Sequence, residues 1–95
     1  MRKLSDIKGE EALDVLAEIL VPITAIANDE EVKKGFETNI AMCVSIALKK
    51  YKSEVMGILA AIDGVEKEDL DIDLVSLPAA LLEVLNEPLV QELFR

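Results

Sequence analysis

Apolar residues return every three or four positions along residues 9 to 20, where the chain reads GEEALDVLAEIL. This spacing places them on one side of a helix, with acidic residues opposite and in the favourable first turn. The apolar members are Ala12, Val15, Leu16, Ile19 and Leu20. Pro22 cannot donate a hydrogen bond to the preceding turn, so we expect the helix to kink there or to restart as PITAIAND.

The stretch from Asp29 to Lys50 predicts two further helices. The run DEEVKKGFE forms a short helix that we expect to be interrupted, or to end, near Gly35. The next run, NIAMCVSIALKK, is apolar on almost every side from Ile40 to Leu48, a pattern typical of a central, surrounded helix. Its last turn carries two lysines, which complement the helix dipole.

The segment SEVMGILAAI predicts the next helix, which begins at Ser53 and stops at Asp63 and Gly64. Gly64 suits the left-handed conformation that often closes a helix. Gly57 lies inside this helix and costs about 1 kcal/mol of helix propensity relative to alanine. We therefore expect a close crossing with another helix at Gly57.

Residues 65 to 75, VEKEDLDIDLV, carry an ambiguous pattern. Leu70, Ile72 and Leu74 alternate with aspartates at a period of two, which is the signal of a strand. However, the rest of the chain predicts no second strand to pair with it. We interpret the segment as a short turn of helix followed by an extended connector that lays these three side chains on the bundle.

The C-terminal residues 76 to 95, SLPAALLEVLNEPLVQELFR, predict two short leucine-rich helices. Ser76 caps the first helix and Pro78 fits its first turn. Asn86 and Pro88 then end this helix and begin the second one, which contains LVQELF. The whole pattern predicts an all-α fold. We expect residues 1–95 to form a single helical domain, a compact bundle of about five to seven short helices.

The chain offers little catalytic or metal-binding chemistry. It contains no histidine, so Cys43 and the hydroxyl side chains lack the usual general base, and Cys43 in its apolar run is expected to be a small core residue. The Asp-x-Asp-x-Asp series at residues 69 to 73 opens like a calcium loop. Yet Leu74 stands where a glycine must turn, and Ala80 where a glutamate must close the site. We expect no enzyme activity, no cofactor and no metal site.

Charge and hydropathy exclude two classes of partner. The chain has 19 acidic and 10 basic residues and a net charge of −9, which repels the phosphates of nucleic acid. Its longest run without charge, Thr38 to Leu48, is well short of the roughly 18 residues that span a bilayer. The N-terminal MRKLSDIKGEE turns acidic where a secretory signal turns apolar, and the single cysteine suits a reducing compartment. We predict a cytoplasmic protein.

The terminal leucines have two explanations. They either close the core of the domain itself, or they form a surface for an apolar helix of a partner. We expect both, with Leu77 and Leu81 anchoring the bundle. The remaining residues would form an apolar edge used for self-association into a homo-oligomer or for capture of a client. These predicted edge residues are Leu85, Leu89, Leu93 and Phe94.

Three segments carry a family resemblance: MRKLSDIKGEEALDVLAEIL, ALKKYKSEVMGILAAIDGV and VSLPAALLEVLNEPLVQELF. With Leu-Pro before a leucine-rich helix, an Asn-x-Pro break and a final Glu-Leu-Phe, the chain resembles the small tail assembly chaperones of long-tailed bacteriophages and prophages of Gram-positive bacteria. The resemblance implies a non-enzymatic protein of the host cytoplasm. Its partner would be the long, helical tape-measure protein, kept soluble until the tail tube polymerises around it.

A second function fits the composition. A small acidic adaptor or antitoxin-like protein would inhibit a basic partner protein through charge, as the net charge of −9 allows. A reading frame for a very long coiled-coil protein just downstream, together with a slippery frameshift site, would favour the chaperone. A transcription-factor or toxin gene alongside would favour the adaptor.

Overall fold

Six α-helices and two short 3₁₀ turns make up the computed structural model, which describes residues 2–95. No strand occurs in this range, and the predicted all-α bundle is confirmed. The elements in chain order are η1 (Leu4–Asp6), α1 (Gly9–Ala27), α2 (Glu30–Thr38), α3 (Ile40–Lys50), α4 (Lys52–Asp63), η2 (Lys67–Asp69), α5 (Ser76–Leu85) and α6 (Pro88–Phe94).

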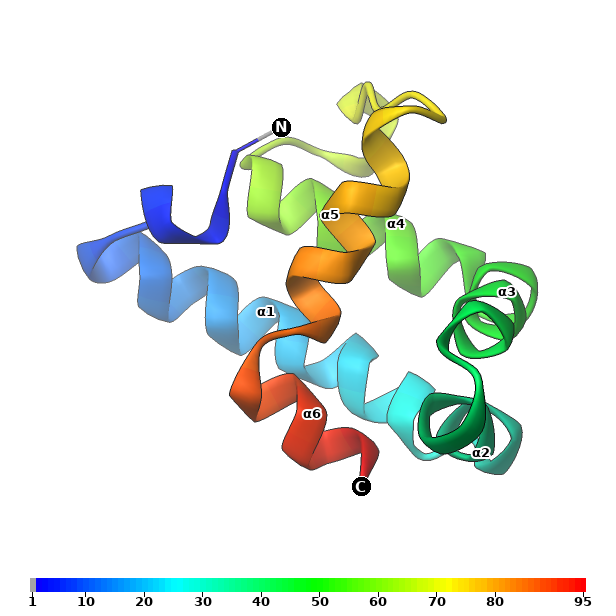
Figure 1. The fold of residues 1–95 in the computed structure, drawn as a ribbon. Coiled ribbons are helices and arrows are strands. Elements are labelled where there is room, and N and C mark those ends of the chain that lie inside the picture. Colours follow the sequence, from blue (N-terminus) through cyan, green and yellow to red (C-terminus); the bar gives the residue numbers. More distant parts are fainter. Residues whose placement is uncertain (1) are drawn as a thin grey trace.

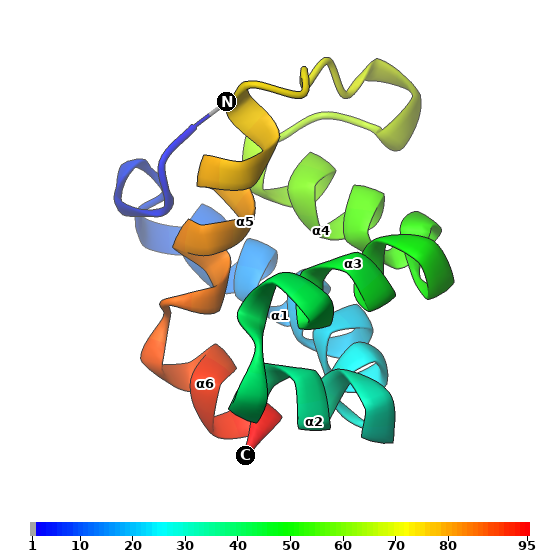
Figure 2. The ribbon, with the colours of Figure 1, turned by 45° about the vertical axis from the view of Figure 1, so that its right-hand side comes forward.

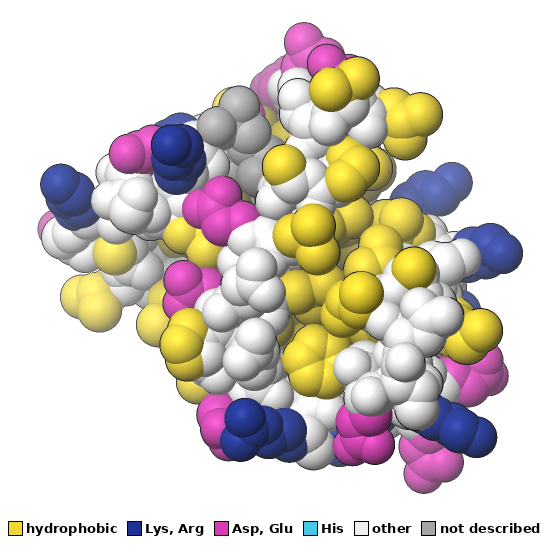
Figure 3. Space-filling view, viewed as in Figure 1, with side chains coloured by type: hydrophobic (Ala, Val, Ile, Leu, Met, Phe, Trp, Pro, Cys, Tyr) yellow, Lys and Arg dark blue, Asp and Glu magenta, His cyan; other side chains and the backbone are white. Residues whose placement is uncertain are grey.

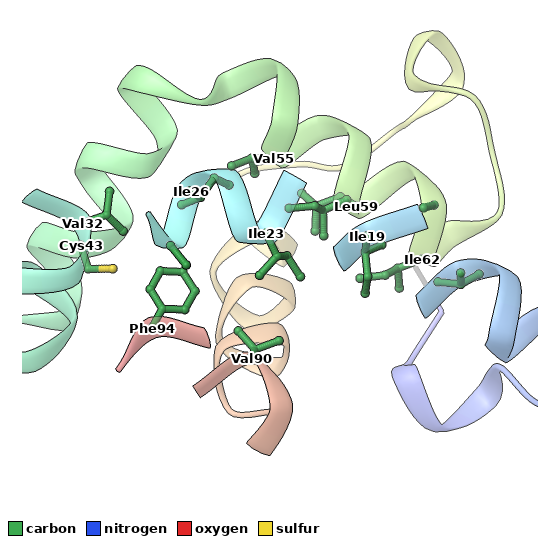
Figure 4. Close-up of a cluster of buried hydrophobic side chains, with 14 residues drawn as sticks. Ile19, Ile23, Ile26, Val32, Cys43, Val55, Leu59, Ile62, Val90 and Phe94 are labelled. Carbon is green, nitrogen blue, oxygen red and sulfur yellow. The ribbon is translucent and has the colours of Figure 1, made fainter. Parts of the chain in front are cut away.

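Helices α1 and α4 pack against each other and supply most of the core, and α5 crosses in front of both (Figure 1). The inward side of α1 carries an isoleucine every three or four residues, and these meet the apolar side of α4 (Figure 4). Burial of one such side chain stabilises the fold by about 1.5 to 3 kcal/mol. The residues drawn at this contact are Ile19, Ile23, Ile26, Val55, Leu59 and Ile62.

The expected restart at Pro22 does not occur, because α1 runs through the proline to Ala27. A proline inside a helix removes one backbone hydrogen bond and costs about 3 kcal/mol. Ile19, Ile23 and Ile26 lie on the same side of α1 before and after the proline, and all three are buried. Their burial offsets the cost of Pro22 and keeps the helix continuous.

Helices α2 and α3 form a hairpin beside the end of α1 (Figure 2). The prediction that α2 would end near Gly35 is wrong, since the helix continues to Thr38. A Cβ atom at Gly35 would lie 3.0 Å from the backbone N and Cα of Cys43. Gly35 therefore allows α2 and α3 to approach closely, and the actual boundary is Asn39, whose Oδ1 accepts from the amides of Ala41 and Met42.

The prediction that residues 40 to 48 form a central, surrounded helix is also wrong. Of the residues in α3, only Cys43 is buried, while Ile40 and Met42 are exposed and Val44 and Leu48 are half-buried. Helix α4 takes the central place instead, with six buried residues. The sequence pattern shows that a helix is apolar on several sides. It does not show which helix is enclosed by the others.

Helix α4 begins one residue before the predicted Ser53 and ends as predicted, with Gly64 in the left-handed conformation at φ 75°. The expected helix crossing at Gly57 is absent among the described residues. Instead, the side chain of Lys67 covers this glycine, and its Cε would lie 3.2 Å from an added Cβ. The space at Gly57 is thus filled by a flexible side chain rather than by a second backbone.

The ambiguous segment after α4 forms a 3₁₀ turn and then an irregular connector, which agrees with our interpretation. Leu70 and Ile72 pack against the core, but Leu74 is 82% exposed, so only two of the three expected side chains lie on the bundle. The N-cap of α5 is Val75 rather than the predicted Ser76, and its side chain makes no capping hydrogen bond. Asp73 Oδ1 instead accepts from the Ser76 amide at 2.7 Å. This hydrogen bond lowers the pKa of Asp73.

Candidate partner-binding surface

A cleft lined by apolar side chains opens between α3 and α5, and Figure 3 shows it as a hydrophobic hollow on the face of the molecule. Helices α1 and α4 form its floor, and α6 contributes Val90 and Phe94. Its free volume is about 60 Å³. The two walls consist of Val44, Ala47 and Leu48 in α3, and of Leu81, Val84 and Leu85 in α5.

The chemistry of this apolar cleft restricts what it can bind. Every residue of its lining is aliphatic or aromatic, apart from Cys43. Burial raises the pKa of the Cys43 thiol, so at neutral pH the thiol is protonated and unsuited to act as a nucleophile. Sites for small polar ligands usually carry a few converging hydrogen-bonding groups. The cleft therefore suits the aliphatic side chains of another polypeptide.

The cleft exists because its two walls are apolar on more than one side. Helix α5 contains only two polar residues, Ser76 and Glu83, yet none of its residues is buried. Leu77 and Leu81 pack inward against the core, while Leu82 on the outer side is 47% exposed. Helix α3 behaves in the same way, so both walls expose apolar surface that the domain does not cover.

The predicted apolar edge divides into three kinds of position. Leu89 is 45% exposed, as a surface residue should be, whereas Leu85 and Leu93 are half-buried against the core. The placement of Phe94 on an exposed edge is wrong: it is 4% exposed and stacks on Phe36, with ring centroids 5.1 Å apart. Leu85 and Phe94 both line the cleft, but Leu89 and Leu93 are not among its lining residues.

The error at Phe94 has a simple geometric cause. Val90 and Phe94 are four residues apart, so they lie on the same side of α6, and that side faces the core. The sequence reasoning also missed the α3 wall, because Val44 and Leu48 were assigned to a surrounded helix. The sequence did contain a signal for both walls, because α3 and α5 are apolar on several sides. One neighbouring helix cannot cover all of these sides, so some apolar surface stays exposed.

A polar cluster fixes the α3 wall to the rest of the bundle. Asp29 caps α2 through Oδ1, while its Oδ2 accepts from the Tyr51 hydroxyl at 2.8 Å and from Lys50 Nζ at 3.3 Å. The hydrogen bond from Tyr51 is the main reason why the pKa of Asp29 is lowered. Lys50 also lies 3.2 Å from Glu31, and hydrogen bonds to Glu31 and Asp29 raise the pKa of Lys50. The cluster ties the junction of α1 and α2 to that of α3 and α4.

Comparisons with known protein families, with curated proteins and with solved structures found no match for this chain. Two further features concern residues 2–95. No three histidine, cysteine, aspartate or glutamate side chains gather closely enough to hold a metal ion. In the same range, no helix combines the length and apolar character required to cross a bilayer.

Proposed function

We propose that this protein is a non-enzymatic chaperone that binds an amphipathic helix of a client protein in the apolar cleft. The observation that carries the proposal is the lining of the cleft, which is apolar throughout and open to solvent. A helix can present aliphatic side chains at every third or fourth residue to such a cleft, as in helix-in-groove recognition. Binding then removes exposed apolar surface from both proteins.

The charge of the protein supports a holding role. The net charge of −9 makes complexes of this protein with a client repel one another. This repulsion opposes aggregation of an apolar client. The same charge attracts clients whose helices carry lysine or arginine beside their apolar side. Such a client is a cationic amphipathic helix.

The proposed client is the tape-measure protein of a long-tailed phage. This identity rests on the resemblance of the leucine-rich C-terminal segment to tail assembly chaperones, and the apolar cleft suits it physically. The chaperone would cover apolar helices of the tape-measure protein in the host cytoplasm until the tail tube assembles around them.

A variant that fills the cleft tests the proposal. Ala47 lies in the α3 wall, so Ala47→Phe would occupy space that a client side chain needs. Ala41→Phe is the matched control, because Ala41 lies on the same helix and is exposed outside the cleft. We expect Ala47→Phe to weaken binding of a fluorescent 18-residue Leu–Lys amphipathic peptide at least about tenfold, which corresponds to about 1.4 kcal/mol. Equal binding by both variants contradicts the proposal.

The same pair of variants can be tested with the tape-measure protein of a long-tailed phage, the proposed client. Co-expression with the wild type or with Ala41→Phe should keep that protein in the soluble fraction, and co-expression with Ala47→Phe should not. If the tape-measure protein stays insoluble with the wild type and with both variants, the proposed identity of the client is wrong. This holds even if the Leu–Lys peptide binds in the cleft.

An acidic adaptor is the alternative, and the exposure of residues 66 to 69 favours it. This acidic segment, which includes Glu66, Glu68 and Asp69, stands apart from the cleft. An adaptor would bind a basic partner there, with an affinity that falls steeply as salt increases. In about 0.5 M salt the screening length is roughly a few ångströms. Peptide binding that disappears in this salt and that is unchanged by Ala47→Phe would favour the adaptor.

A further inference from the structure

Helix α5 is held less firmly than the other wall of the cleft. Its side chains contact the core from one side only, and none of them is buried. Within residues 2–95, the backbone of α5 comes closest to that of α6, the helix that directly follows it, and approaches the other helices at fewer positions. The opposite wall, α3, is fixed by its close contact with α2 at Gly35 and by the cluster around Asp29.

Both ends of α5 join segments that interrupt the helix. Residues 70 to 73 before it form no helix, and Asn86 and Glu87 separate it from α6. Helix α6 itself is anchored, because Val90 and Phe94 are buried in the core. The two connections of α5 are therefore the places where a hinge could lie, since hinges are loop or element-terminal residues.

One polar contact joins α5 to the N-terminal segment. The amide of Leu4 donates to Glu83 Oε1 at 2.8 Å, and this hydrogen bond is exposed to solvent. The N-terminal segment is itself well anchored. Arg2 donates from Nε to the carbonyl oxygen of Ile62 at 2.9 Å and from its backbone N to Asp63 Oδ1 at 3.1 Å, and its Nη1 lies 2.9 Å from Glu11.

The free volume of the cleft is too small for a whole helix. Two packed helices have their axes about 8 to 10 Å apart, and several side chains of one must enter the surface of the other. The free volume of the cleft, about 60 Å³, is far smaller than a turn of helix with its side chains. A client helix can bind along the cleft only if one wall moves, and α5 is the wall with the weaker attachment.

We propose that α5 is a hinged wall of the cleft and that the hydrogen bond from the Leu4 amide to Glu83 holds this wall in its closed position. A cationic amphipathic helix would enter the cleft by displacing α5. The proposal rests on the cleft being the client site, as proposed above. An exposed hydrogen bond to a carboxylate is readily exchanged for water, so it favours the closed position without locking it. In the free protein this hydrogen bond would keep the cleft narrow until a client helix competes for it.

The test removes the hydrogen bond between Leu4 and Glu83, called the latch below, and leaves the side chains that line the cleft unchanged. Glu83→Ala deletes the acceptor, and Glu87→Ala is the matched control, because it removes one acidic charge just beyond α5 without touching the latch. Amide hydrogen exchange is measured on the free proteins, and affinity is measured with the 18-residue Leu–Lys peptide. We expect Glu83→Ala to speed exchange in α5 and to bind the peptide more tightly, each by about threefold to tenfold, with exchange in α4 unchanged.

The outcomes separate this proposal from the proposed function. If the peptide binds the wild type, and Glu83→Ala binds it no more tightly than Glu87→Ala does, the hinged wall is wrong and the cleft proposal stands. Unchanged exchange in α5 also overturns the hinged wall. If the peptide does not bind the wild type or any variant, the cleft is not the client site and both proposals fail. Glu83→Gln, which keeps an acceptor, should restore slow exchange in α5.

Discussion

Helices α4 and α5 are both short and rich in apolar residues, yet the bundle uses them in opposite ways. Helix α4 has 12 residues and buries six of them, although it also carries polar residues at its two ends. Helix α5 has 10 residues, is more uniformly apolar, and buries none. Apolar composition therefore does not determine burial. The number of neighbours around a helix does, and α5 keeps apolar surface that the bundle does not cover.

The largest expected effect contrasts one leucine from each of these helices. Leu59 in α4 is 2% exposed, so Leu59→Ala should leave a cavity and lower the free energy of unfolding by about 3 kcal/mol. Leu82 in α5 is half exposed, and Leu82→Ala should change it by no more than about 0.5 kcal/mol. Urea denaturation followed by circular dichroism measures both. Equal losses would mean that α5 belongs to the core.

A pair of glycines tests whether close backbone contact holds the hairpin of α2 and α3. Gly35→Ala would place a Cβ 3.0 Å from backbone atoms of Cys43, which cannot easily move, and we expect a loss of about 1 to 2 kcal/mol. Gly57→Ala meets only the end of the flexible Lys67 side chain and gains helix propensity, so it should be neutral or stabilising by up to about 1 kcal/mol. The same urea experiment decides, and a neutral Gly35→Ala would show that the hairpin tolerates separation.

The smallest expected effect concerns the polar cluster that fixes the α3 wall, and it depends on pH. The pKa of Asp29 is lowered in the folded protein, chiefly by the hydrogen bond from Tyr51. Its contribution to stability is therefore present above the unfolded pKa of about 3.9, and it is lost as the pH falls through the lower folded pKa. Asp29→Asn should lower the melting temperature at pH 7 and have a smaller effect near pH 3.

Glu30→Gln is the control for this prediction, because it removes a charge from the same turn, where none of the described hydrogen bonds involves the Glu30 side chain. It should lower the melting temperature less than Asp29→Asn does at pH 7. A loss for Asp29→Asn that is the same at both pH values would mean that the carboxylate charge of Asp29 adds no stability.

The placement of the helices was largely predictable from local chemistry. Apolar spacing predicted α1 and α4, Gly64 ended α4 in the left-handed conformation, and Pro88 began α6. Each of these signals acts within one or two turns of backbone, so no distant residue needs to be known. Pro22 and Gly35 misled the prediction because their local cost is offset by partners elsewhere in the chain.

The candidate site was predictable only in part. Leu85 was expected at a binding surface and lines the cleft, but the α3 residues Val44 and Leu48 were expected inside the core. Phe94 was expected outside and stacks on Phe36 instead. In each case the periodicity gave the apolar side of a helix, and the error lay in the element against which that side packs.

The sequence by itself determined that this chain is helical, aliphatic and acidic, and where most of its helices begin and end, because those properties follow from short-range hydrogen bonding and from composition. The tertiary structure decided which apolar helix is enclosed. Helix α4 lies between α1, α3 and η2, whereas α5 rests on one side of the bundle. Which helix is enclosed depends on contacts between residues far apart in the chain. The apolar period of 3.6 residues shows only which side of a helix is apolar, so it does not specify these contacts.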